Sequence, residues 1–233
     1  MELQITGLKK SFDKKEVLKD INYTFKSGKI YGLLVKNGYG KTTLFNCLSQ
    51  DMDVDGGESI LITNQQKKAL ETDDIGYVLS TPTVPSFLTG REFLEFFLEI
   101  NKIPNYQDTN QYFEIINIDE DDRDKLMRDY SHGMKNKMQM LVNLLAKPNV
   151  LLLDEPLTSL DIIAAEEMKS FLRSMKTDRI TIFSTHILDL AVDLCDVIVL
   201  LHQGVLEEID KENISSTDFK QKILLALKEE KNV

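Results

Sequence analysis

The sequence VKNGYGKTT, residues 35–43, follows the apolar run IYGLL and leads into TTLFNCLSQ, which has helical spacing. This stretch matches the phosphate-binding loop pattern G-x-x-x-x-G-K-[ST] at every defined position except the first, where Val35 replaces glycine. A strand, a glycine loop and a helix in this order place backbone N–H groups and a positive helix N-terminus around an anion. The stretch therefore predicts a nucleotide-phosphate site at the start of a helix.

The second half of this loop carries the expected contacts. Gly38 and Gly40 let the backbone turn tightly and approach the phosphates, because no Cβ intervenes. Lys41 reaches the terminal phosphates as a point charge, and the Thr42 hydroxyl ligates Mg²⁺. The residues expected to bind the nucleotide here are Asn37, Gly38, Tyr39, Gly40, Lys41, Thr42 and Thr43. A glycine turn followed by a solvated lysine is the alternative interpretation.

A second feature is the run VLLLDEP, residues 150–156, which delivers two adjacent carboxylates at the end of an apolar strand. We expect Asp154 to hold Mg²⁺ through its water shell and Glu155 to act as the general base on the attacking water. The alternative is a polar strand end that enters a turn before Pro156. A phosphate loop and such a strand in one sheet together predict a nucleoside triphosphatase.

The rest of the chain supports an α/β fold of the phosphate-loop type. The first 34 residues read as short strands joined by polar turns, which predicts an N-terminal antiparallel β subdomain. Thr89 and Glu92 form a capping-box pattern that opens a helical subdomain, approximately residues 86–148. Buried strands then alternate with helices, as in a mainly parallel sheet. We expect one domain over residues 1–233, ending in an amphipathic helix at approximately 217–230.

Composition limits the function classes. The 233 residues include 38 acidic and 28 basic side chains, for a formal net charge of -10, which disfavours a nucleic-acid surface. Two cysteines without a paired spacing favour a reducing, cytoplasmic setting. The N-terminus lacks the apolar core of a signal peptide, and no run of about 18 apolar residues is present to span a membrane. Any membrane process would therefore involve a partner.

Further motifs appear in order along nearly the whole chain. Residues 130–134 read Tyr-Ser-His-Gly-Met where ATP-binding cassette (ABC) ATPases usually have the signature Leu-Ser-Gly-Gly-Gln. Residues 157–161, LTSLD, resemble the D-loop of that family, and His186 in STHILD is similar to its switch histidine. Phe12 resembles the aromatic residue that stacks on adenine. With the phosphate loop and the DE strand end, these motifs identify the chain as resembling an ABC ATPase of the bacterial drug and antimicrobial-peptide exporter type.

The resemblance assigns roles to individual residues. It makes Lys41, Glu155 and His186 the catalytic set, with His186 contacting the γ-phosphate of ATP. It implies a C₂ dimer in which Ser131 and Gly133, at a helix N-terminus, face the γ-phosphate held by the other subunit. Without the resemblance, His186 reads as a satisfied core histidine, and Phe12 reads equally as a strand packing residue.

The chain departs from the family pattern at several positions. Lys36 follows Val35 where proline is common, and His132 replaces the first signature glycine. Ser80 replaces the Q-loop glutamine, so the expected Mg²⁺ ligands are Thr42, Asp154 and Ser80. Because serine is shorter than glutamine, a water molecule would fill the gap between Ser80 and the ion. Val35 is tolerated at negative φ and excluded at positive φ. We expect a working but weaker nucleotide site.

The leading hypothesis is the ATPase subunit of a membrane exporter, peripheral at the inner face of the cell membrane. It would work as a homodimer or heterodimer of ATPase subunits on a separate transmembrane permease, which docks near Ser80 and TPTVPSFLTG, residues 81–90. One alternative is a soluble cassette ATPase working on ribosomes or DNA. Another is a regulatory subunit that binds ATP without turning it over. The sequence does not indicate the transported substrate.

Overall fold

The computed structural model describes residues 1–36, 38–103, 108–158, 160, 162–174 and 176–210. Asn37 and the expected terminal helix, approximately 217–230, lie outside these residues, as do two positions of the LTSLD motif, 159 and 161. Within the described ranges, no helix combines the length and apolar character required to cross a bilayer.

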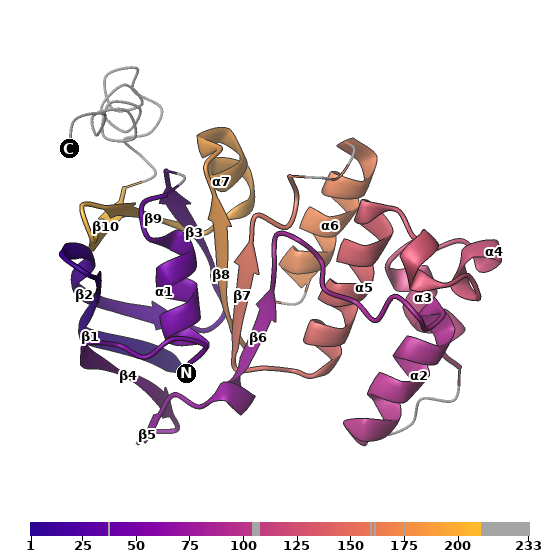
Figure 1. Ribbon diagram of the computed structural model, residues 1–233, viewed down its shortest axis with the longest axis horizontal. Coiled ribbons are helices and arrows are strands. Elements are labelled where there is room, and N and C mark those ends of the chain that lie inside the picture. The colour runs from indigo at the N-terminus through magenta and orange to yellow at the C-terminus, as the bar shows by residue number, and fades with distance from the viewer. Residues whose placement is uncertain (37, 104–107, 159, 161, 175, 211–233) are drawn as a thin grey trace.

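A six-stranded sheet forms the centre of the molecule, in the order β10-β9-β3-β8-β7-β6 (Figure 1). Strands β9, β3, β8, β7 and β6 run parallel to one another, and β10 pairs antiparallel with β9. The strands are β3 (Ile30–Val35), β6 (Ile75–Val78), β7 (Val150–Asp154), β8 (Ile180–Thr185), β9 (Val197–His202) and β10 (Val205–Ile209). The expected mainly parallel sheet is therefore confirmed.

A second sheet of four antiparallel strands, in the order β2-β1-β4-β5, lies at one end of the molecule (Figure 1). It contains β1 (Glu2–Phe12), β2 (Lys15–Lys26), β4 (Gly56–Thr63) and β5 (Gln66–Ala69). The N-terminal strands were expected from the sequence, whereas β4 and β5 were not identified. A short 3₁₀ helix, η1 (Thr72–Asp74), then leads to β6.

Helices cover both faces of the central sheet, which explains its continuous apolar strands. Helix α1 (Lys41–Leu48) packs between the two sheets, while α6 (Ile162–Ser174) and α7 (Leu188–Leu194) pack on the opposite face. Side chains of β7 alternate accordingly: Val150 and Leu152 face α1, and Leu151 and Leu153 face α6. The two faces together hold β7 in the core and fix where it ends.

The remaining helices gather at the other end of the molecule from the antiparallel sheet (Figure 1). They are α2 (Gly90–Ile100), α3 (Asn110–Ile115), α4 (Glu120–Arg123), the 3₁₀ helix η2 (Met127–Asp129) and α5 (His132–Leu145). They enclose an apolar cluster of their own around Leu94, Phe113 and Met138. The capping box is present, because Thr89 Oγ1 accepts from Glu92 N at 3.1 Å and Glu92 Oε2 accepts from Thr89 N at 2.8 Å. The division of the chain into such a subdomain stays our interpretation.

Candidate active site

Three neighbouring parallel strands end at one edge of the central sheet. β3 ends at Val35, β7 ends at Asp154 and β8 ends at Thr185. Because β8 pairs with both β3 and β7, the residues that follow these strands lie together. The structure places Lys41, Asp154, Glu155, Ser184 and His186 in one set of contacts here, which we call the Lys41 cluster.

The glycine loop enters α1 through left-handed backbone. Gly38 has φ 86° and Gly40 has φ 95°, in the region that favours glycine. A Cβ on Gly40 would also lie 2.9 Å from Val17 Cγ1, so no other residue fits that position without a shift. Gly40 is the N-cap of α1, and no side chain caps the helix there. The first turn of α1, which carries Thr42 and Thr43, thus presents backbone N–H groups suited to an anion.

Val35 is the last residue of β3, where it pairs with Leu201 and is buried in the core cluster. The described residues with positive φ do not include it. Val35 thus occupies an ordinary strand position without the positive φ that would exclude valine. Beyond it, Lys36 Nζ lies 3.3 Å from Tyr39 Oη and 4.8 Å from the centre of the Tyr39 ring.

Lys41 joins the two carboxylates that follow β7. Its Nζ lies 2.8 Å from Asp154 Oδ1 and 2.6 Å from Glu155 Oε1, and all three side chains are largely buried. Burial alone would lower the pKa of Lys41, but the hydrogen bonds to Asp154 and Glu155 leave it raised. Burial would likewise raise the pKa of Glu155, and the Lys41 hydrogen bond leaves it lowered. Lys41 and Glu155 are therefore both charged at neutral pH.

Ser184 and His186 both contact these carboxylates. Ser184 Oγ donates to Asp154 Oδ1 at 2.8 Å and accepts from the backbone N–H of Glu155 at 3.1 Å. His186 Nδ1 lies 3.1 Å from Glu155 Oε2. Sequence reasoning missed Ser184, although a hydroxyl in the otherwise apolar part of RITIFSTH was a signal. Ser184 is fully buried, and a buried hydroxyl needs a hydrogen-bond partner.

Other predicted site residues lie on neighbouring elements. Ser80 is exposed just beyond β6, the strand beside β7 at the same sheet edge. Ser131 is the N-cap of α5, and its Oγ accepts from Met134 N at 3.1 Å. A Cβ on Gly133 would lie 3.3 Å from Leu160 Cδ2. Phe12 ends β1 with 44% of its surface exposed.

None of the hydrogen bonds or ion pairs among the described residues connects Phe12, Ser131 or Gly133 with the Lys41 cluster. The structure thus joins the catalytic set and Asp154 by direct contacts, and it shows no such contact for the expected adenine and signature residues among the described residues.

The donors suit Mg²⁺ better than a metal held by protein alone. Among the described residues, no group of three or more His, Cys, Asp or Glu side chains is placed to hold a metal ion. The set expected from the sequence offers one carboxylate, Asp154, and the hydroxyls of Thr42 and Ser80. Mg²⁺ is commonly held by one or two carboxylates together with substrate phosphates and water. The residues present fit that kind of binding.

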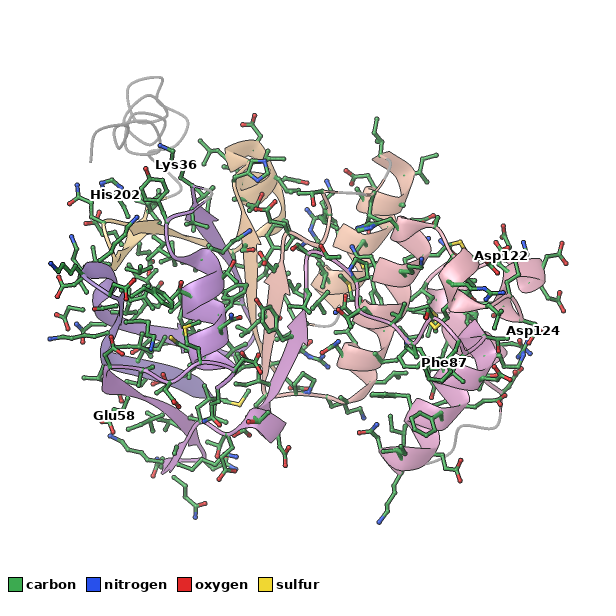
Figure 2. All side chains as sticks on the ribbon, viewed as in Figure 1. Lys36, Glu58, Phe87, Asp122, Asp124 and His202 are labelled. Atoms are coloured by element: carbon green, nitrogen blue, oxygen red, sulfur yellow. The ribbon has the colours of Figure 1, made fainter. Side chains whose placement is uncertain are left out.

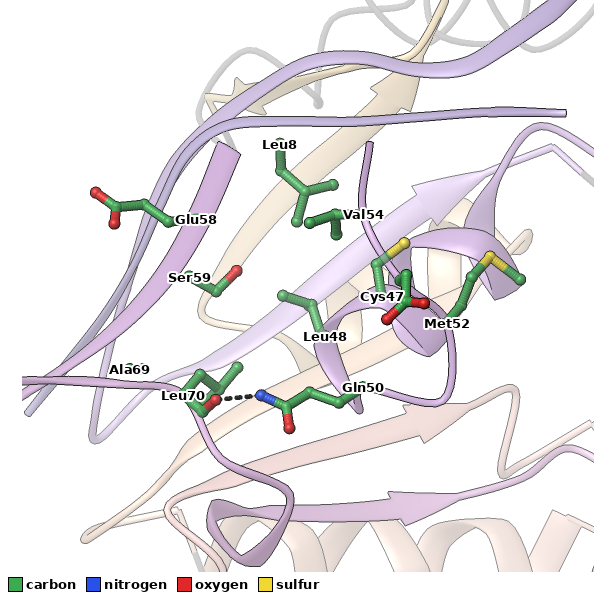
Figure 3. A pocket seen from close by; sticks show the side chains of 11 residues that line it. Leu8, Cys47, Leu48, Gln50, Met52, Val54, Glu58, Ser59, Ala69 and Leu70 are labelled. Carbon is green, nitrogen blue, oxygen red and sulfur yellow. Dashed lines mark hydrogen bonds between the residues drawn. The ribbon is translucent and has the colours of Figure 1, made fainter. Parts of the chain in front are cut away.

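A separate cavity of about 320 Å³ lies near the C-terminal end of α1 (Figure 3). Leu48, Gln50 and Leu70 are among the residues that line it, and Gln50 Nε2 donates to the Leu70 carbonyl across one side. None of the residues lining it belongs to the Lys41 cluster. The cavity is therefore separate from the phosphate site expected at the start of α1.

Comparisons with known proteins agree with this geometry. A sequence profile of the ABC transporter family matches residues 18–158. The bacitracin transport ATP-binding protein BcrA of Enterococcus faecalis is 31% identical, over 93% of this chain and 73% of the relative. The lantibiotic transport ATP-binding protein SrtF of Streptococcus pyogenes is 28% identical over 87% of each chain.

The fold also matches a solved structure, described as the ATP binding subunit of an ABC transporter. It superposes with a TM-score of 0.78, covers 97% of this chain and 99% of its own, and shares 22% identity. At that identity the match concerns the fold alone.

Proposed function

This chain belongs to the ABC transporter family of ATP-binding proteins, and from that premise we propose how its own residues bind and cleave ATP to power a membrane transporter. The relatives named for bacitracin and lantibiotic transport support an exporter of the antimicrobial-peptide type. The observation that carries the proposal is the Lys41 cluster, which combines a phosphate-binding lysine with two carboxylates at a strand end.

Lys41 has two sets of possible partners in this arrangement. Its Nζ contacts both Asp154 and Glu155, so binding a terminal phosphate means exchanging at least one carboxylate for a phosphate oxygen. The exchange would free Asp154, which with Thr42 and Ser80 would hold Mg²⁺. When bound, Mg²⁺ supplies positive charge that neutralises the phosphate oxygens. Lys41 thereby links the binding of phosphate to the release of the catalytic carboxylates.

Glu155 is the general base in this proposal. Its lowered pKa keeps the carboxylate ionised at neutral pH, so Glu155 can accept a proton from water. His186 lies on the other carboxylate oxygen from Lys41, 3.1 Å away, and is 44% exposed on its side chain. From this position it can fix the orientation of Glu155 and still present its ring to the γ-phosphate.

The adenine and signature contacts complete the site from two further elements. Phe12 offers an exposed ring for stacking on adenine. Ser131 and Gly133, at the N-terminus of α5, would contact the γ-phosphate bound by another ATPase subunit, in a homodimer or a heterodimer. Neither residue makes a described hydrogen bond to the Lys41 cluster of its own chain, which agrees with a site shared between two subunits.

A separate permease would dock beside Ser80 and the start of the helical region. Phe87, between β6 and α2, is 75% exposed and is labelled in Figure 2. The surrounding segment, residues 81–90, is framed by two prolines and carries further apolar side chains. Docking here would hold the chain at the cytoplasmic face of the membrane and connect the permease to the edge of the sheet next to β7.

Replacing Lys41 tests this proposal most directly. Lys41→Ala removes the charge that binds phosphate, so ATP binding measured by calorimetry should fall by at least about 100-fold and turnover with it. Lys36→Ala is the matched control, because Lys36 lies in the same loop but contacts Tyr39 rather than the carboxylates. Equal effects of the two substitutions would mean that Lys41 has no special role. Measurable binding without turnover in the unaltered chain, assayed with its permease, would instead favour a binding-only regulatory subunit.

A further inference from the structure

Asn136 connects helix α5 to the segment that follows Glu155. It lies in the second turn of α5 and is only 2% exposed. Its Nδ2 donates to the backbone carbonyl of Pro156 at 2.6 Å. That carbonyl belongs to the residue immediately after Glu155, so the amide of Asn136 acts one peptide away from the proposed base.

The orientation of this amide follows from its partner. A proline carbonyl can only accept a hydrogen bond, so the nitrogen of Asn136 must face it. The other end of the amide, Oδ1, is buried without a hydrogen-bond partner in the described structure. An unpaired buried acceptor costs free energy. An apolar residue would avoid that cost, so the Pro156 contact is the one evident gain from an amide here.

The backbone at Glu155 needs such support. Its φ is 48°, a left-handed conformation that is unfavourable for a residue with a side chain, and the following proline further restricts it. Such a conformation persists where surrounding contacts hold it. Ser184 Oγ accepts from Glu155 N, and Thr158 donates to Glu155 O through both N at 3.2 Å and Oγ1 at 2.9 Å. Asn136 adds the one contact in this set that comes from the helical region.

Helix α5 also begins with the proposed signature residues. Ser131, its N-cap, precedes Asn136 by five residues, which corresponds to about 7 Å along a helix. Gly133, between them, approaches Leu160, a residue of the same segment that follows Glu155. A rigid helix of this length moves as a unit, so a shift at its N-terminus would reach the Pro156 carbonyl through Asn136.

We propose that Asn136 is a positioning residue. Through its hydrogen bond to the Pro156 carbonyl, a displacement of the α5 N-terminus changes the position of Glu155. The inference rests on the proposed function of Glu155 as the base. Asn136 touches neither ATP nor water in this scheme. It sets where the Glu155 carboxylate points, and so it affects the catalytic step rather than the binding of ATP.

Asn143 provides a matched control on the same helix. Its Nδ2 donates to the Gln139 carbonyl at 2.8 Å, within α5, so it makes the same kind of amide-to-carbonyl bond. It does not contact the segment after β7 through any hydrogen bond of the described residues. Replacing either asparagine with leucine removes an amide donor while keeping the branched shape and the number of side-chain heavy atoms. Only one of the two replacements removes a link to Glu155.

The experiment is an ATP titration of the steady-state ATPase of the full chain. Asn136→Leu should lower kcat by about tenfold and leave KM for ATP within about twofold, because it misplaces the base without altering the phosphate loop. Asn143→Leu should change both constants by less than about twofold. On a Glu155→Gln background, Asn136→Leu should add less than about twofold, since the base it positions is absent.

Three results would overturn the inference. One is an unchanged kcat in Asn136→Leu, and another is an equal loss in the two leucine variants. The third is a full additional loss on the Glu155→Gln background. If Asn136→Leu does not fold, Asn136→Ala is judged by the same criteria. Failure of the proposed function gives a different pattern, in which Glu155→Gln itself leaves turnover unchanged.

Discussion

The Lys41 cluster and the N-terminus of α5 both present polar groups at the end of a secondary structure element, but their groups are paired differently. In the Lys41 cluster, Lys41, Glu155 and His186 are partnered by side chains of one chain that come from the start of α1 and from the ends of β7 and β8. At α5, Ser131 is exposed and its side-chain hydrogen bond, accepted from Met134 N, caps its own helix. The side chains of the first region are paired with one another, whereas among the described residues the Ser131 side chain bonds only within its own helix.

This difference separates two kinds of experiment. Changes in the Lys41 cluster should alter turnover within each subunit, whether or not the subunits associate tightly. Changes at the N-terminus of α5 should alter association in the presence of ATP, and should leave the binding of ATP to a single chain intact. Loss of single-chain ATP binding from a change at the N-terminus of α5 would argue against a site shared between subunits.

The largest effect is expected from Glu155→Gln. The amide keeps the size of the side chain but cannot accept the proton, so kcat should fall by at least about 100-fold while ATP still binds. A nucleotide-bound dimer should accumulate. Steady-state turnover and nucleotide retention measure the two effects. Glu207→Gln, an exposed change on β10, is the control. Unchanged turnover in Glu155→Gln would remove it from the role of base.

Ser131→Arg tests the N-terminus of α5 and should abolish the ATP-dependent association of subunits. The larger side chain would block the α5 N-terminus, so on a Glu155→Gln background ATP-dependent dimers should be lost while single-chain ATP affinity is retained. Size-exclusion chromatography with Mg-ATP measures the first property and calorimetry the second. Thr89→Arg removes the N-cap of α2 in the same way, without touching α5, and should leave the dimers intact. Dimers in both variants would mean that the signature faces elsewhere.

A smaller effect is expected from Ser184→Ala. Loss of its hydroxyl leaves Glu155 N and Asp154 without one partner each, so kcat should fall by about tenfold and unfolding free energy by about 1–3 kcal/mol. Thr181→Val removes another buried hydroxyl from β8, at the far end of the strand from the cluster. Melting and turnover of the two variants separate a general loss of stability from a specific one. An equal loss of turnover in both would deny Ser184 an orienting role.

Local patterns in the sequence predicted the parts of the molecule that depend on neighbours along the chain. The apolar runs before the glycine loop and before Asp154 predicted β3 and β7, and the capping box predicted the start of α2. Ser184 and Asn136 could not be predicted in this way. The role of Ser184 depends on β8 lying beside β7, and that of Asn136 depends on α5 packing against the turn after β7. Both are tertiary contacts that leave no periodic pattern.

The antiparallel strands β4 and β5 escaped prediction for a related reason. Every residue of β5 is exposed, so QKKA has none of the alternation that marks a half-buried strand. The pairing of β4 with β1 joins segments on opposite sides of the glycine loop in the sequence. Only the assembled sheet shows that they belong together.

The smallest effect is expected at the position where the loop pattern fails. Val35 lies in β3 with its side chain in the core, so its methyl groups pack in the interior and do not strain the loop. Val35→Gly should therefore change ATP affinity by less than about tenfold, or 1.4 kcal/mol, in either direction. It should lower unfolding free energy by on the order of 2 kcal/mol, from the lost buried side chain and the added backbone freedom. Val199→Gly, in the same cluster on β9, should cost similar stability without touching the loop. Calorimetric titration and thermal melting of both variants provide the measurements. ATP affinity that tightened tenfold or more in Val35→Gly alone would show that the native valine strains the phosphate loop after all.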